Sequence, residues 1–172
     1  MDRAGLQRNG LQSRPAVPTR LIMPSLSDLV VLSADRQPVM IVECKNGRGT
    51  SAQSVALYRR NLLAHDLLPP IPFYLLAFST MLFLWKGNAE PEDLPQFSAP
   101  AGLLLHDYVP SVAAQNPVLN ADSLELVMHS WLDDLANGIR KPKDSSEADQ
   151  MLIKSGVLEL IRNGTVSSRI AL

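Results

Sequence analysis

Short, dense apolar runs predict several β-strands in the first half of the chain. Two of these runs, 27–32 and 38–45, are rich in Leu, Val and Ile and are separated by only a few polar residues. Strands of this composition are typically buried, and a short polar connection between them predicts an antiparallel hairpin. Two further strands are predicted at 73–78 and 81–86, joined through Ser79-Thr80.

Apolar residues at helical spacing predict three helices farther along the chain. The first covers about 52–65, where Thr50 or Ser51 can cap the amino end, and Arg59 and Arg60 are expected at its outer side. The second, about 122–136, carries a stripe of Leu, Val and Trp, and the third covers about 150–162.

This order of elements divides the chain into four parts. They are a tail or frayed helix at 1–17, a core at 18–88, a linker or loop region rich in Pro and acid at 89–121, and a helical region at 122–172 that packs on the core. Strands followed by a helix and further strands are typical of the α/β class. We therefore expect a small mixed sheet flanked by helices, with a helical C-terminal extension.

Composition excludes several classes of protein. The chain has 172 residues, of which 46% are apolar, as in ordinary globular domains. No run approaches the roughly 18 apolar residues that a membrane-spanning helix needs. The single cysteine, Cys44, excludes an internal disulfide framework and a cysteine-based zinc site. The expected setting is cytoplasmic, with no membrane partner.

Charge is distributed unevenly along the chain. Residues 1–60 hold nine Lys and Arg against four Asp and Glu, whereas residues 61–172 hold seven against thirteen. A locally basic region favours an anionic partner such as a phosphodiester backbone. Chance imbalance over a short window is the alternative.

Three charged residues stand at the ends of the first two apolar runs. Asp28 opens the first run, and Glu43 and Lys45 close the second. Because residues two apart in a strand share a face, Glu43 and Lys45 should point one way and Cys44 should face the core. Two neighbouring carboxylates suit a divalent cation, for which Mg²⁺ is the natural candidate and Mn²⁺ an alternative. The competing interpretation is a hairpin whose end charges are solvated.

These residues resemble the motif of the PD-(D/E)XK nuclease superfamily. Ser27-Asp28 stands where that family has Pro-Asp, and Glu43-Cys44-Lys45 stands where it has (D/E)XK. The succession of hairpin, helix and further strand over 18–88 is also similar to its restriction-endonuclease-like core. The resemblance implies that Asp28, Glu43 and the backbone carbonyl of Cys44 bind Mg²⁺ and that Lys45 supports the attacking water. It also implies that Gln53 helps to set the site, with Tyr58 farther along the same helix.

The resemblance implies Mg²⁺-dependent hydrolysis of DNA, with RNA as an alternative substrate and a homodimer if both strands are cut together. Many active members carry a further glutamate on an upstream helix, whereas the only acid before Asp28 is Asp2. The alternative is therefore a catalytically inactive nuclease-like fold that binds nucleic acid or protein. A third possibility is a scaffold or toxin–antitoxin partner that assembles through the helix at 122–136.

Three arginines and two tryptophans complete the set of candidates. Arg48, Arg59 and Arg60 are weaker candidates for contact with a phosphate backbone, and a solvated helix face is the alternative for the last two. Trp85 and Trp131 are expected to be core residues rather than stacking platforms for bases.

Overall fold

A computed structural model describes residues 27–48, 51–110 and 118–168. Within them, six strands form one mixed sheet in the order β5-β4-β3-β2-β1-β6. The strands are β1 (Leu29–Leu32), β2 (Pro38–Cys44), β3 (Phe73–Ala77), β4 (Met81–Lys86), β5 (Phe97–Pro100) and β6 (Thr165–Ser168). The tail predicted at 1–17, Asp2 and the candidate cap Thr50 lie outside the described residues.

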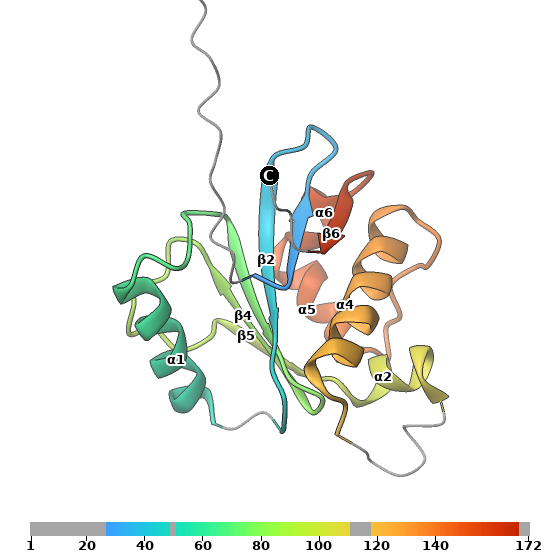
Figure 1. Cartoon of the computed structure of the whole chain (residues 1–172). Helices are drawn as coiled ribbons and strands as arrows, with labels where there is room; N and C mark the ends of the chain where they lie inside the picture. The colour runs from blue at the N-terminus through green and yellow to red at the C-terminus, as the bar shows by residue number, and fades with distance from the viewer. Residues whose placement is uncertain (1–26, 49–50, 111–117, 169–172) are drawn as a thin grey trace, which may run out of the picture.

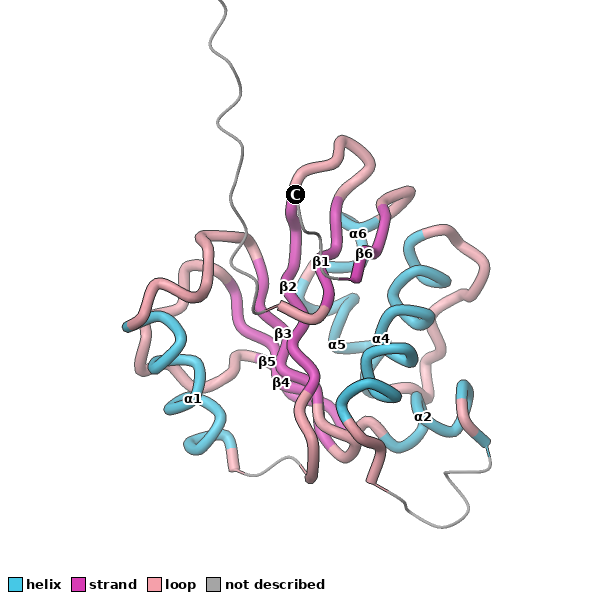
Figure 2. Tube along the Cα trace, in the orientation of Figure 1, coloured by secondary structure: helices cyan, strands magenta, loops and turns pink. Residues whose placement is uncertain are grey.

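The helices cover the two faces of the sheet unequally. They are α1 (Ala52–Ala64), α2 (Gly102–Tyr108), α4 (Ala121–Ala136), α5 (Glu147–Ser155) and α6 (Val157–Ile161). Among the described elements, α1 lies on one face and the other helices lie on the opposite face (Figures 1 and 2). The predicted α/β class, with a mixed sheet flanked by helices, is confirmed. None of the helices described is both long and apolar enough to cross a membrane.

The centre of the sheet is built from the predicted hairpin and the strand that follows α1. Strands β1 and β2 are antiparallel, with Leu29 opposite Val42, as the sequence predicted. Strand β3 lies parallel to β2 on its other side, with Glu43 opposite Leu76, so α1 forms the crossover between two parallel strands. Strand β2 is therefore interior to the sheet, and its carboxyl end adjoins both neighbours.

Two apolar layers hold the helices to the sheet. The larger layer packs α4, α5 and α6 against side chains such as Val42 and Cys44, and includes the fully buried Trp131. The smaller layer packs α1 against side chains such as Ile41, and includes the fully buried Trp85. The prediction that both tryptophans are core residues is confirmed.

The predicted third helix is interrupted by a glycine. Instead of one helix at 150–162, α5 begins at Glu147 and ends at Ser155, and α6 begins at Val157. Gly156 between them adopts φ +88°, a left-handed conformation that glycine reaches without a side-chain penalty. The single-helix prediction was wrong because both segments carry apolar residues, which hides the change of direction.

A buried aspartate joins α5 to α4. The Asp149 carboxylate is fully buried and accepts hydrogen bonds from Trp131 Nε1 at 2.8 Å, from Arg140 Nη2 at 2.7 Å and from the backbone N–H of Lys143 at 2.8 Å. These three donors compensate the loss of water around the charge. Asp149 therefore holds α5 against α4 and against the segment that connects the two helices.

The region predicted as linker or loop, 89–121, contains regular structure. Strand β5 pairs antiparallel with β4, with Phe97 opposite Leu84, and α2 follows directly. Strand β6, which the sequence pattern did not predict, pairs antiparallel with β1 at the other edge of the sheet. Both missed strands have only four residues, and each buries only one of them, so their apolar signal is weak.

Gly164 leads into β6 where two backbones come into close contact. A Cβ atom at this position would lie 2.0 Å from the carbonyl oxygen of Leu32 and 2.8 Å from that of Ile161. We expect Gly164→Ala to lower the free energy of unfolding by about 1–3 kcal/mol, because backbone must move to admit the methyl group. Urea denaturation measures this change.

Gly102 provides the matched control for that substitution. A Cβ atom there would meet nothing within 4 Å, and the residue begins α2, where alanine suits a helix. Gly102→Ala is expected to leave the urea midpoint unchanged or slightly raised. Equal midpoints for the two variants would contradict the close approach at Gly164.

Candidate functional site

A buried carboxylate, Glu43, lies at the carboxyl end of β2. Its side chain is only 3% exposed and contacts three donor groups, two phenols and one ammonium. Tyr58 of α1 donates to Oε1 at 2.7 Å, Tyr74 of β3 donates to Oε2 at 2.8 Å, and the Lys45 ammonium lies 2.5 Å from Oε1. The interpretation of a hairpin with solvated end charges is therefore wrong for Glu43.

The donors around Glu43 keep their protons. Burial raises the pKa of Tyr58 and raises that of Tyr74 well above its ordinary value, and the Glu43 carboxylate raises both further. Burial alone would lower the pKa of Lys45, but its interactions with Glu43 and Tyr58 outweigh burial, so this pKa is raised. Lys45 is therefore a stable cation, suited to neutralising an anion rather than to accepting a proton.

Asp28 contacts the backbone between Glu43 and Lys45. Asp28 lies one residue before β1, and its Oδ2 accepts a hydrogen bond of 2.7 Å from the N–H of Cys44. Continuing the β1–β2 register by one residue from Leu29 and Val42 places Asp28 opposite Glu43. The structure thus brings Asp28, Glu43 and Lys45 to one end of the hairpin, as the sequence predicted.

Cys44 faces the opposite side of the sheet from Glu43. It is buried in the layer that contains α4, which confirms the prediction that it is a core residue. Burial raises the pKa of its thiol far above the ordinary range, and the carboxylates of Asp28, Glu125 and Glu43 raise it further. A reactive thiolate is therefore disfavoured, and Glu125 of α4 joins the acids near this end of β2.

The remaining predicted residues do not join this group. Gln53 lies on the exposed side of the first turn of α1, and its side chain makes no hydrogen bond to another described residue. Tyr58 of the same helix reaches Glu43 instead. Arg48 and Arg60 are exposed, as expected for residues that could meet a phosphate backbone.

Arg59 is buried, so its expected position at the outer side of α1 was wrong. Its guanidinium donates to the carbonyl of Glu90 at 2.9 Å and to that of Ala89 at 3.0 Å, and it lies 5.8 Å from the ring of Trp85. These contacts hold the segment after β4 against α1. Arg60, its exposed neighbour, remains the candidate for a surface contact.

Two residues of the site were missed by sequence reasoning, Tyr74 and Glu125. The signal for Tyr74 was its hydroxyl within an otherwise apolar run, because a buried phenol usually has a hydrogen-bond partner. The signal for Glu125 was weaker, since an acid on a helix is ordinarily a solvated residue. Only the packing of α4 against β2 brings it near Cys44.

The carboxylate oxygens at this site are the type of ligand atom that suits a magnesium ion. Mg²⁺ commonly uses one or two carboxylates and keeps several waters, and Asp28 and Glu43 would provide two. Glu43 Oε2 accepts one hydrogen bond from the described residues, whereas Oε1 already accepts two donors. Within the described ranges, no three His, Cys, Asp or Glu side chains are grouped so that they could hold a metal among them.

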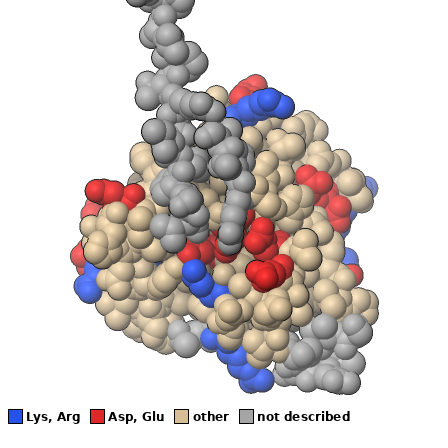
Figure 3. Space-filling model, in the orientation of Figure 1, with Lys and Arg blue, Asp and Glu red and all other residues tan. Residues whose placement is uncertain are grey.

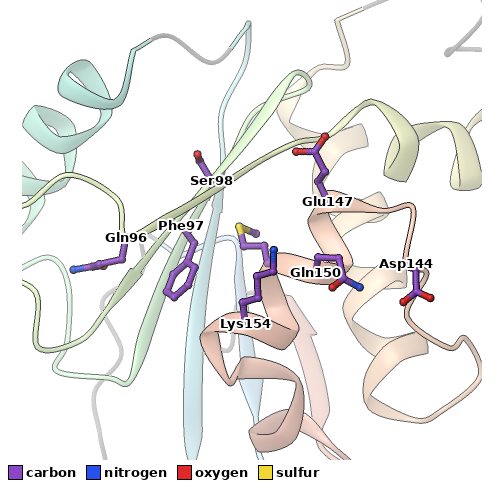
Figure 4. Close-up of a pocket in the computed structure, with 8 residues that line it drawn as sticks. Gln96, Phe97, Ser98, Asp144, Glu147, Gln150 and Lys154 are labelled. Atoms are coloured by element: carbon purple, nitrogen blue, oxygen red, sulfur yellow. The ribbon is translucent and has the colours of Figure 1, made fainter.

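The surface offers two further observations. Acidic and basic side chains gather together near the middle of the face drawn in Figure 3. A separate hollow of about 570 Å³ lies between β5 and α5 (Figure 4). Phe97 and Lys154 line it together with Asp144 and Glu147, and each of these charged residues is exposed. It contains none of the predicted site residues.

Comparison with known proteins leaves the family open. No protein-family model matches the chain, and neither the curated proteins nor the solved structures contain a significant match.

Proposed function

We propose that the chain is a Mg²⁺-dependent nuclease that hydrolyses phosphodiester bonds of DNA at the site formed by Asp28, Glu43 and Lys45. The observation that carries the proposal is that these three residues meet at the end of one hairpin. Glu43 is buried and forms an ion pair with Lys45, and the Asp28 carboxylate accepts a hydrogen bond from the backbone N–H of Cys44. Buried carboxylates with dedicated partners are more typical of a functional site than of a chance surface pair.

The arrangement of the central strands supports this proposal. An antiparallel hairpin, a crossover helix and a strand parallel to the second hairpin strand follow in the order that the resemblance to PD-(D/E)XK nucleases implies. The two motif segments are then neighbours because they lie on paired strands. The function does not follow from this arrangement alone, because one fold supports many activities.

Each residue has a role that its surroundings allow. Asp28, Glu43 and the backbone carbonyl of Cys44 would hold the metal. A bound Mg²⁺ supplies Lewis-acid stabilisation of a phosphoryl oxygen and lowers the pKa of a coordinated water. Lys45, a stable cation, is suited to orient the attacking water or to neutralise a phosphate oxygen. Tyr58 and Tyr74 position the Glu43 carboxylate.

The second candidate is a nuclease-like module that binds nucleic acid or protein without cleaving it. The observation that favours it is the Glu43 carboxylate, which is 3% exposed and already holds three donors. A carboxylate satisfied in this way can serve as a purely structural group. A metal titration separates the two candidates.

Mn²⁺ titration followed by the electron paramagnetic resonance of the free ion tests the proposed site. We expect the wild-type protein to bind Mn²⁺ and Glu43→Gln to bind it at least about tenfold more weakly, because the amide keeps the shape but loses the charge. Glu92→Gln, a change at an exposed acid, should bind as wild type does.

The non-catalytic candidate predicts a different outcome for the same titration. The wild-type protein would then leave the free Mn²⁺ signal unchanged, or would bind the ion equally in Glu43→Gln. Circular dichroism of each variant confirms that a loss of binding reflects the site rather than the fold.

A further inference from the structure

Strand β5 forms one edge of the six-stranded sheet. It pairs with β4, and no strand among the described residues lies on its other side. The N–H of Ala101, directly after β5, donates to the carbonyl of Thr80 at 3.0 Å. Because backbone bonds to one neighbour alternate along an antiparallel strand, Phe97 and Ala99 also bond to β4. The N–H and C=O of Ser98 therefore point outward, away from β4.

The outer side of β5 is open to pairing. Ser98 and Pro100 are both exposed, whereas Ala99 between them is buried. Pro100 has no N–H to donate, and within sheets proline is found mainly on edge strands. An exposed edge can accept a further strand through its outward N–H and C=O groups. Strand β5 can therefore extend the sheet by one strand.

Helix α5 borders the same edge. The hollow of about 570 Å³ is lined by Phe97 and Ser98 from β5 and by Glu147, Gln150 and Lys154 from α5 (Figure 4). The three helical residues are three and four residues apart, so they form one stripe along α5. Glu147 begins the helix and Lys154 is its second-last residue, and both are exposed. The stripe thus has a negative end and a positive end.

This stripe on α5 is complementary to itself in reverse. When two copies of α5 lie antiparallel, Glu147 of each copy lies level with Lys154 of the other copy. Asp144, which also lines the hollow, adds a second acid at the Glu147 end. A two-fold axis generates this arrangement, because it repeats each contact on both sides of the interface. The same axis sets two β5 strands antiparallel, a direction in which strands pair.

We propose that a second copy of this chain docks at this edge, with the two β5 strands paired antiparallel about Ser98 and the two α5 stripes facing each other. The two Ser98 residues would exchange both N–H···O bonds, and one sheet would continue across the two copies. The order of charges along α5 favours a second copy over an unrelated peptide, because this chain itself carries the matching order.

The proposed interface does not depend on nuclease activity. The hollow is lined by none of Asp28, Glu43 and Lys45, so each copy would carry a complete candidate site of its own. Separating the copies should therefore leave the rate at which one site cleaves one strand unchanged.

Reversal of the two charges on α5 tests the proposal, with sedimentation velocity of the full chain as the measurement. The wild-type protein is expected to dimerise. Glu147→Lys and Lys154→Glu should each weaken dimerisation at least about tenfold, because each replaces an attractive contact by a repulsive one on both sides of the axis. An equimolar mixture of the two variants should recover dimers, since every contact in the mixed dimer again joins opposite charges.

Two further pairs of measurements supply the controls. Ser98→Pro removes the outward N–H and should weaken dimerisation, whereas Ser98→Thr keeps the N–H, suits a strand and should dimerise as wild type does. Asp35→Lys reverses an exposed charge in the turn between β1 and β2, and it should also leave dimerisation unchanged. Circular dichroism of each variant is compared with that of the wild type.

Three results would overturn the inference. A wild-type protein that stays monomeric at all concentrations would show that this edge does not bind a second copy. A dimer that is unaffected by Glu147→Lys and by Ser98→Pro would place the interface elsewhere. Single charge variants that are folded and monomeric, and stay monomeric when mixed, would show that the two charges do not meet across an interface.

Discussion

Lys45→Ala is expected to lower the rate of Mg²⁺-dependent DNA cleavage by about 10²–10³-fold, the usual effect of removing one group that stabilises developing charge. The ammonium lies 2.5 Å from Glu43 Oε1 and is 35% exposed, so it borders both the buried carboxylate and the solvent from which DNA would come. Cleavage of a linear duplex under single-turnover conditions measures the loss.

The fold should survive this substitution, because Glu43 keeps both phenolic donors. Lys154→Ala, which removes an exposed lysine from α5, is the matched control and should cleave at the wild-type rate. Lys45→Arg is expected to retain only part of the activity, since a planar guanidinium does not replace a compact ammonium at a close contact. Wild-type cleavage by Lys45→Ala would exclude the proposed role of this residue.

Asp149→Ala is expected to destabilise the protein by about 3–5 kcal/mol, the usual cost of breaking a buried ion pair by removing one partner. Arg140 would lose its 2.7 Å ion-pair partner and keep a longer ion pair to Asp107, at 3.3 Å, together with its contact to the Tyr108 ring. Trp131 Nε1 would also lose its buried acceptor. Thermal and urea denaturation followed by circular dichroism measure the loss.

Asp144, an exposed acid in the turn before α5, gives the control for Asp149. Asp144→Ala should change stability by no more than about 0.5 kcal/mol, the usual range for surface substitutions. Asp149→Leu combined with Arg140→Met should recover part of the loss, because no unpaired charge then remains. Equal stability of Asp149→Ala and Asp144→Ala would show that the buried network contributes little.

The central strands could be predicted because each one is a distinct apolar run in the sequence. Dense apolar runs separated by short polar segments indicated β1 and β2, and the helical stripe at 122–136 indicated α4. Strand β5 gave no such signal, because its short run exposes alternate residues and depends on pairing with β4. Gly156 divides α5 from α6 by its positive φ, and a continuous apolar stripe conceals that turn.

The alternation of side chains between the two faces of a strand, here called strand parity, predicts part of the site. Parity placed Glu43 and Lys45 together and Cys44 in the core, and the contacts agree. Tyr74 lies 31 residues from Glu43 in sequence, so their hydrogen bond depends on the parallel register of β2 and β3. The acceptors of Arg59 come from residues 89 and 90, which no pattern on α1 could indicate.

The single cysteine can report local opening of the fold in the unmodified protein. Cys44 is 3% exposed at the end of an interior strand, and burial suppresses its thiolate. A thiol reagent therefore reacts only when β2 separates from α4 or from its neighbouring strands. The labelling rate of the unmodified protein reports the free energy of opening at the very segment that carries Glu43 and Lys45, without any engineered reporter.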